Sequence, residues 1–226
     1  MPKPTFFNLP PEKQDTILEI AIEEFARHDY GVASISRLVK QAHISKGSFY
    51  QYFEDKQDLY LYLVDLAIEK EVEFLLAVEP PESQKGFFPY LRWLFERSSD
   101  FVTNDPRWCQ LLYRASYGDF PFRDEVLHRT QLTSRSYLQD LVKAGIERGE
   151  ITEDIDTDLA IFAIDALWEG SRYWIPRKLA IDFKNIDRED ITEDKIKFVR
   201  QWFDGLTYIL ENGISTKKHR KTPHQP

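Results

Sequence analysis

Cationic side chains gather in residues 31–53, GVASISRLVKQAHISKGSFYQYF, a window that contains no Asp or Glu. The whole chain carries 38 acidic and 30 basic residues, so an acid-free window is a local exception. Arg37, Lys40 and Lys46 supply the positive charge, and neighbouring serines supply hydroxyl groups. Protein surfaces that face nucleic-acid phosphates need cations and hydrogen-bond donors. The chemistry that this window suggests is therefore the binding of a phosphate backbone.

The apolar spacing in the same window predicts two short helices joined by a tight turn. Ser34 is a good N-cap for the first helix, ISRLVKQA, and Ser45 is a good N-cap for the second, KGSFYQYF. Residues 42–44 would form the turn between them. In a helix-turn-helix the second helix lies in the DNA major groove while the first crosses the backbone. The window therefore predicts a helix-turn-helix that binds DNA.

The second helix would begin with small and cationic residues that let its backbone approach DNA closely, namely Ser45, Lys46, Gly47 and Ser48. Hydroxyl groups there can donate to phosphates or base edges. Tyr50 can donate its hydroxyl group to a phosphate, and Gln51 can pair with adenine through its amide. Lys56 opens the next helix, where its cation and the free backbone N–H groups would form an anion site.

The composition indicates an all-α protein of one or two domains. Of its 226 residues, 42% are hydrophobic and only 9 are glycine, and apolar residues recur at three- and four-residue spacing almost throughout. The formal net charge of −8 disfavours nucleic-acid binding when taken alone. The charge on the contacting face decides the matter, however, so the acid-free window outweighs the total.

The periodicity places further helices on both sides of the window. Pro10 and Pro11 would open a first helix that stops near Gly31, and residues 79–86, EPPESQKG, read as a linker. Residues 176–191 read as a loop. The remaining helices are expected at about 55–78, 86–104, 106–116, 122–148, 158–175 and 192–212.

Other classes of protein lack support in the sequence. Cys109 is the single cysteine, so an intramolecular disulfide is impossible, which suits a reducing compartment. The sequence contains neither a signal peptide nor an apolar run near the roughly 20 residues that span a bilayer. The histidines have no partners at metal-ligand spacing, and motifs of catalysis or of cofactor binding are missing. We expect a cytoplasmic protein that is not an enzyme and holds no metal or cofactor.

Residues 33–65 resemble the TetR family of transcriptional regulators. That family has Ser or Thr before the second helix, Ser-Lys-Gly-Ser/Thr at the start of the third, then Tyr-x-x-Phe, and Lys opening the fourth. Here the pattern falls on Ser34, Ser45-Lys46-Gly47-Ser48, Tyr50, Phe53 and Lys56. Two positions depart from it. His43 stands where the turn usually has Gly, and Arg37 stands where an acid is frequent, which would strengthen phosphate binding if Arg37 is exposed.

The resemblance implies an N-terminal three-helix domain with the helix-turn-helix and a C-terminal helical domain for ligand binding and dimerisation. The expected boundaries are 1–54 for the DNA-binding domain, 55–215 for the effector and dimerisation domain, and 216–226 for a disordered basic tail. The implied function is a dimeric repressor that a small-molecule effector releases from a palindromic double-stranded DNA operator. The alternative is a helical adaptor of the same fold without DNA binding.

Aromatic and guanidinium side chains one turn apart suggest an effector site for a flat or anionic compound. The candidates for this site are Leu66, Trp93, Arg97, Tyr113, Tyr137, Trp168 and Arg172. The other interpretation is that the arginines pair with nearby acids such as Glu96, Asp165 or Glu169.

The last two helices are the expected dimer elements. Residues 158–175 are apolar nearly all round, so something must bury this helix, and the final helix carries one apolar stripe. Together with their symmetry mates, the two helices would form a four-helix bundle. The alternative is that both bury their apolar faces within one monomer.

Overall fold

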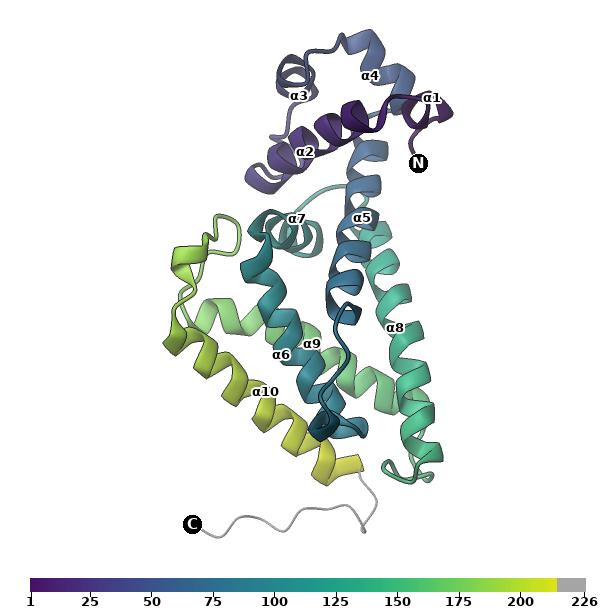
Figure 1. The fold of residues 1–226 in the computed structure, drawn as a ribbon, viewed down its shortest axis with the longest axis vertical. Helices are drawn as coiled ribbons and strands as arrows, with labels where there is room; N and C mark the ends of the chain where they lie inside the picture. The colour runs from purple at the N-terminus through teal and green to yellow at the C-terminus, as the bar shows by residue number, and fades with distance from the viewer. Residues whose placement is uncertain (215–226) are drawn as a thin grey trace. The chain divides into compact units, whose positions relative to one another are not determined.

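The computed structural model describes residues 1–214, apart from the side chains of residues 132–134 and 214 (Figure 1). Across this part of the chain the structure is helical and contains no β-strand, so the all-α prediction is confirmed. Within the same residues, no helix is both long and apolar enough to cross a membrane. The tail expected at 216–226 lies outside the described residues.

The α-helices are α1 (Pro4–Phe7), α2 (Pro11–Arg27), α3 (Ile35–Gln41), α4 (Lys46–Tyr52), α5 (Lys56–Leu76), α6 (Phe87–Asn104), α7 (Pro106–Tyr117), α8 (Arg123–Glu147), α9 (Thr157–Lys178) and α10 (Glu193–Ile214). Short 3₁₀ turns lie at η1 (Glu82–Gln84) and η2 (Arg188–Asp190). The predicted order of long helices is confirmed, and α8 ends at Glu147, shortly before Gly149, whose φ is +69°.

Two helix ends and one short helix differ from the sequence prediction. Helix α2 ends at Arg27, before the glycine that was expected to end it. Helix α9 continues through Pro176 to Lys178, because a proline in the last turn removes one hydrogen bond while its buried ring and the neighbouring Ile175 add packing. Helix α1 was not anticipated, since four residues are too few to give a periodic pattern.

The chain forms two compact units. The first, unit 1, comprises Met1–Phe74, Asn104–Thr130 and Phe183–Asp187, and the second, unit 2, comprises Leu75–Thr103, Gln131–Asp182 and the described residues from Arg188 onward. These units do not coincide with the proposed functional division at residue 54, because α7 and parts of α5 and α8 pack with the N-terminal helices. The functional division therefore stays a proposal.

Aromatic rings fill the core of unit 1. Tyr60 of α5 is buried, and its ring centroid lies 5.0 Å from that of Phe25 on α2 and 5.2 Å from that of Tyr30. Phe120 and Phe122, which precede α8, complete the cluster at 5.6 and 6.0 Å from Tyr60. Burial of such rings supplies most of the stabilisation that holds α2 against α5.

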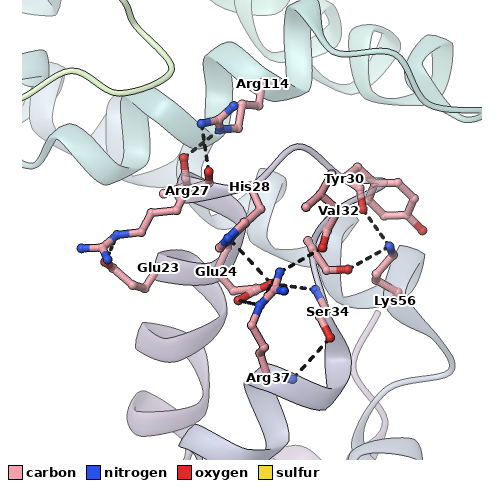
Figure 2. Close-up of polar contacts among 12 residues, drawn as sticks. Glu23, Glu24, Arg27, His28, Tyr30, Val32, Ser34, Arg37, Lys56 and Arg114 are labelled. Carbon is pink, nitrogen blue, oxygen red and sulfur yellow. Dashed lines mark hydrogen bonds and ion pairs between the residues drawn. The ribbon is translucent and has the colours of Figure 1, made fainter.

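A buried arginine joins three separate segments of unit 1. Arg114 on α7 is 5% exposed, and its Nε donates to the carbonyl oxygen of Ala26 at 2.7 Å. One Nη donates to Asp29 Oδ1 at 2.6 Å, and the other donates to the carbonyl oxygens of Arg27 at 3.2 Å and Lys184 at 2.7 Å. This side chain therefore caps the C-terminal end of α2 (Figure 2). Its bond to Lys184 also joins this end of α2 to residues 183–187.

Unit 2 has its own apolar core, built from α6, α8, α9 and α10. The ring of Trp168 on α9 stacks on Phe95 of α6, with centroids 5.0 Å apart, and packs on Phe203 of α10 at 5.5 Å. Gly145 on α8 lets this helix approach α6 closely, because a Cβ there would lie 3.0 Å from Phe87 and 2.9 Å from Ile151.

Candidate nucleic-acid interface

Both helices of the helix-turn-helix begin at the predicted serine caps. The Oγ atom of Ser34 accepts a hydrogen bond from the backbone N–H of Arg37 at 3.4 Å. The Oγ atom of Ser45 accepts from the backbone N–H of Ser48 at 2.9 Å. These bonds satisfy N–H groups that a helix start leaves free, so α3 and α4 begin where the sequence placed them.

The turn between α3 and α4 depends on His43, whose φ is +52°. This left-handed conformation is the one that a glycine normally supplies, and histidine tolerates it better than most residues. The N–H of Ile44 donates to the carbonyl oxygen of Val39 at 3.0 Å, which closes the turn. The departure from the family pattern at His43 is therefore compatible with an intact turn.

Packing separates the two faces of α4. Phe49 and the following Phe53 are completely buried, whereas Tyr50 is 50% exposed. The other exposed residues at the start and outer face of this helix are Ser45, Lys46, Gly47 and Gln51. Gly47 presents open backbone there, because a Cβ at this position would meet nothing nearer than Ser45 Oγ at 3.5 Å. The structure therefore gathers five of the predicted DNA-contact residues on one exposed face, with Ser48 half-buried beside them.

Arg37 is held inside the protein's own network, which the sequence did not show. Its Nε lies 3.1 Å from both carboxylate oxygens of Glu24, and one Nη lies 2.6 Å from Glu24 Oε1 (Figure 2). The same Nη donates to the carbonyl oxygen of Val32 at 2.9 Å. The guanidinium group therefore fixes α3 against α2, while 45% of the Arg37 side chain stays exposed, so its contact with a phosphate stays a prediction.

Lys56 also serves the fold. Its Nζ donates to the carbonyl oxygens of Tyr30 at 2.7 Å and Ala33 at 3.1 Å, and lies 4.3 Å from the centroid of the Tyr30 ring (Figure 2). Burial lowers the pKa of Lys56. The side chain points at the loop before α3, so the geometry does not support the predicted anion site at the start of α5.

Two residues that the sequence pattern did not single out also organise this interface. Glu24 is buried and also accepts from the backbone N–H of Ser34 at 2.6 Å. Lys13 of α2 donates to the carbonyl oxygen of Ala42 at 2.8 Å, which caps the C-terminal end of α3. The sequence did offer a signal for Glu24, since this residue lies on the apolar side of α2. A carboxylate buried there needs a cationic partner.

The carboxyl group of Glu24 has a lowered pKa in the folded protein. Burial raises its pKa, but the Arg37 side chain, the backbone N–H of Ser34 and the charge of His28 lower it by more, so the net pKa is lowered. The folded-state pKa therefore lies below that of the unfolded chain. The stabilisation from this carboxylate is complete above about pH 4.3 and is lost as the pH falls through the folded-state value.

We expect the substitution Glu24→Gln to destabilise the protein by about 2 kcal/mol, because it removes charge-assisted hydrogen bonds to a buried acceptor. Urea unfolding at pH 7 measures this loss. Repeating it at pH 3 should show a smaller difference from the wild type. The matched control is Glu23→Gln, which removes the Arg27–Glu23 pair with its exposed arginine, and it should cost less than about 1 kcal/mol. Equal losses for the two variants would contradict the assignment.

The effector candidates are divided between the two units. Leu66 and Tyr113 belong to unit 1, where Tyr113 packs on Tyr117 with ring centroids 4.8 Å apart and on Phe183 at 5.5 Å. The five others, Trp93, Arg97, Tyr137, Trp168 and Arg172, belong to unit 2.

Two of the candidates in unit 2 share one partner. Tyr90 stacks on Trp93, with ring centroids 5.6 Å apart, and its hydroxyl group forms a hydrogen bond with the hydroxyl group of Tyr137. Burial and this bond raise the pKa of Tyr137. Trp168 packs in the core, and Arg172 Cζ lies 5.9 Å from the centroid of its ring. A nitrogen of the Arg172 guanidinium group also lies 4.0 Å from Glu169 Oε1, which is the acid pairing that the alternative interpretation expected.

Two parts of the chain match families of known proteins. Residues 17–63 match the family of bacterial regulatory proteins of the tetR type, and residues 85–215 match the tetracyclin repressor-like C-terminal domain. A TetR family transcriptional regulator from Chloroflexus aurantiacus J-10-FL is 35% identical, with a TM-score of 0.71 over 96% of this chain and 100% of that protein.

Two further proteins extend the comparison. The HTH-type transcriptional regulator YuxN of Bacillus subtilis, itself uncharacterized, is 26% identical over 133 residues, which span 57% of this chain and 43% of that regulator. The transcriptional regulator FadR from Bacillus subtilis, solved in complex with stearoyl-CoA, has a TM-score of 0.63 at 20% identity over 88% of this chain and 98% of FadR. At this identity the likeness to FadR concerns the fold.

The comparisons agree with the helix-turn-helix geometry, and proteins of this type regulate transcription and are not enzymes. The chain belongs to the TetR family of bacterial transcriptional regulators.

Proposed function

We propose that this protein is a cytoplasmic, dimeric repressor that leaves a palindromic operator when a small-molecule effector binds its C-terminal helical part. The observation that carries the proposal is the exposed face of α4, where Ser45, Lys46, Gly47, Tyr50 and Gln51 lie together without an acidic neighbour inside residues 31–53. A capped helix with this face has the chemistry that the major groove requires.

The contacts divide into two kinds. The hydroxyl groups of Ser45, Ser48 and Tyr50 and the ammonium group of Lys46 suit phosphate oxygens, which fix the position of the protein on DNA. The amide of Gln51 suits a base edge, which carries sequence information. Ser34, the N-cap of α3, would contact the DNA backbone that this helix would cross.

The dimer proposal rests on apolar side chains that α9 and α10 leave exposed. Leu159 and Phe162 of α9 are 58% and 68% exposed, and Ile209 of α10 is 62% exposed. A Cβ atom added at Gly170 or Gly205 would have no described atom within 4 Å, so partner helices could approach closely there. A second copy of the chain would remove this apolar surface from water by completing a four-helix bundle.

We expect the double substitution Phe162→Asp and Ile209→Asp to convert the dimer into a monomer, because it would place carboxylates in a desolvated interface. Sedimentation velocity at micromolar concentration measures the change. The control is Lys143→Asp, which changes an exposed residue of α8 and should leave the mass unchanged. A wild-type monomer, or a double variant that still dimerises, would contradict the proposed interface.

For the effector we propose a chemical class, a flat or anionic compound. FadR from Bacillus subtilis is described with stearoyl-CoA, and the two proteins share a fold. In unit 2 the stacked pair of Tyr90 and Trp93, the bonded Tyr137 and the half-buried Arg97 offer rings and a cation to a flat or anionic compound. Such a compound would act by binding more tightly to the conformation that cannot engage two adjacent major grooves.

The decisive experiment is selection of bound fragments from a random DNA pool by the purified protein. The proposal expects a palindromic site whose half-sites lie about 10 base pairs apart or a multiple of that spacing. A folded dimer that enriches no sequence would favour the alternative, a helical adaptor of the same fold.

A further inference from the structure

The N-terminal segment caps the C-terminal end of α4. A helix leaves its last carbonyl groups without partners inside the helix, and in α4 these are the carbonyls of Tyr50, Gln51 and Tyr52. Lys3 Nζ donates to Tyr50 O at 3.0 Å, and the backbone N–H of Lys3 donates to Tyr52 O at 2.7 Å. Thr5 Oγ1 donates to Gln51 O. Residues outside the helix-turn-helix therefore satisfy all three groups.

An aromatic anchor fixes this segment in place. Phe6 of α1 is completely buried, and its ring centroid lies 5.0 Å from Phe53 and 6.2 Å from Tyr52. The neighbouring Phe7 is 49% exposed and provides a natural comparison. Lys3 Nζ also pairs with Glu54 Oε2 at 2.8 Å, which adds a contact just beyond the end of α4.

Helix α4 needs such support because it has seven residues, a length at which isolated helices do not form in water. Two of the residues whose carbonyls are capped, Tyr50 and Gln51, are also proposed to contact DNA through their side chains. Movement of this end of the helix would displace both side chains relative to a base edge.

We propose that Lys3, Thr5 and Phe6 are positioning residues that set the orientation of α4 and thereby the sequence specificity of the protein. The inference rests on the proposed DNA-binding function. In this role the three side chains act through the backbone of α4 and do not themselves read DNA.

The test compares three variants with the wild type: Lys3→Gln/Thr5→Ala, Phe6→Ala and the control Phe7→Ala. The dissociation constant is measured for the selected operator and for an unrelated duplex at the same salt concentration, together with the thermal midpoint. The first two variants should bind the operator about tenfold more weakly, with affinity for unrelated DNA unchanged, since one lost contact of about 1.4 kcal/mol gives that factor. Phe7→Ala should match the wild type, and Lys3→Gln/Thr5→Ser should recover part of the loss.

Two results would overturn the proposal. Equal weakening on both DNAs, with a lower salt dependence, would make Lys3 a direct phosphate contact. A lower thermal midpoint with an unchanged ratio of the two affinities would make the segment a general stabiliser.

Amide hydrogen exchange separates this inference from the proposed function. The amides of Gln51 and Tyr52 should exchange about tenfold faster in Lys3→Gln/Thr5→Ala than in Phe7→Ala, whether or not DNA is bound. Accelerated exchange in a protein that selects no operator would refute the proposed function while leaving the capping of α4 established. Unchanged exchange would refute the capping role itself.

Discussion

The double substitution Lys46→Ala/Tyr50→Ala is expected to weaken operator binding by at least about 100-fold. Both side chains lie on the exposed face of α4, where Tyr50 meets the edge of the Phe49 ring at 5.2 Å between centroids, while Phe49 and Phe53 fill the core beneath. Each substitution would remove a proposed contact to a charged phosphate, which contributes about 1.5–3 kcal/mol, and the proposed dimer would lose each contact twice. Fluorescence anisotropy with the selected operator measures the change.

Salt titration provides a second measurement for the same variant. Within residues 31–53 the exposed cations are Arg37, Lys40 and Lys46, and the charge of Arg37 is already paired with Glu24, which leaves the two lysines for this estimate. Four such lysines in a dimer correspond to a slope of about −3.6 in a plot of log affinity against log salt concentration. Loss of Lys46 should reduce this slope by about 2. The control Lys70→Ala removes an exposed lysine of α5 that pairs with Glu73, and an equal effect there would refute the assignment to α4.

The second large effect is expected at Arg114. The substitution Arg114→Met keeps the apolar stem but leaves the carbonyl oxygens of Ala26, Arg27 and Lys184 without their donor. Because the side chain is 5% exposed, water cannot replace the guanidinium group freely, and the free energy of unfolding should fall by about 3–5 kcal/mol. Urea unfolding gives the value directly.

A neighbour on the same helix serves as the control for Arg114. Arg107 pairs with Asp105 and Glu19 at 2.7 Å in both cases, but all three side chains are partly exposed. Arg107→Met should therefore cost about 1 kcal/mol or less. Comparable losses for the two variants would mean that burial does not distinguish them, and the role assigned to Arg114 would be wrong.

The pH dependence of the Arg114 junction follows from Asp29. The hydrogen bond from Lys184 lowers the pKa of this carboxyl group, burial raises it, and Arg114 lowers it further, so the net pKa is lowered. The contribution of Asp29 to stability is therefore present at neutral pH and is lost as the pH falls through its folded-state pKa. The Arg114 variant should lose less stability than the wild type between pH 5 and pH 3.

The sequence predicted features whose causes are local. The caps at Ser34 and Ser45 and the left-handed turn at His43 each depend on residues within four positions, so the pattern alone places them. The family resemblance extended this to the fold of the whole chain, and the comparisons confirmed it.

The roles of individual cations could not be predicted in the same way. Arg37 binds a residue 13 positions earlier, and Lys56 binds carbonyl groups 26 and 23 positions earlier. Such partners are chosen by tertiary packing, which the spacing of residue types does not encode. The effector candidates show the same limit, because Trp168 sits between two core rings that other helices provide.

The segmented construction of unit 1 has a consequence for synthesis of the protein. Helices α1–α4 are complete once residue 52 has emerged from the ribosome, but Lys184, whose carbonyl oxygen and ammonium group join Arg114 and Asp29, is made much later. At about 5–20 residues per second, this segment follows the end of α4 by roughly ten seconds. During that interval the nascent chain can form α1–α4 and the cap that Arg114 provides for α2, so a chain stalled before residue 183 should already protect α4 from proteolysis although Arg114 and Asp29 still lack their contacts with Lys184.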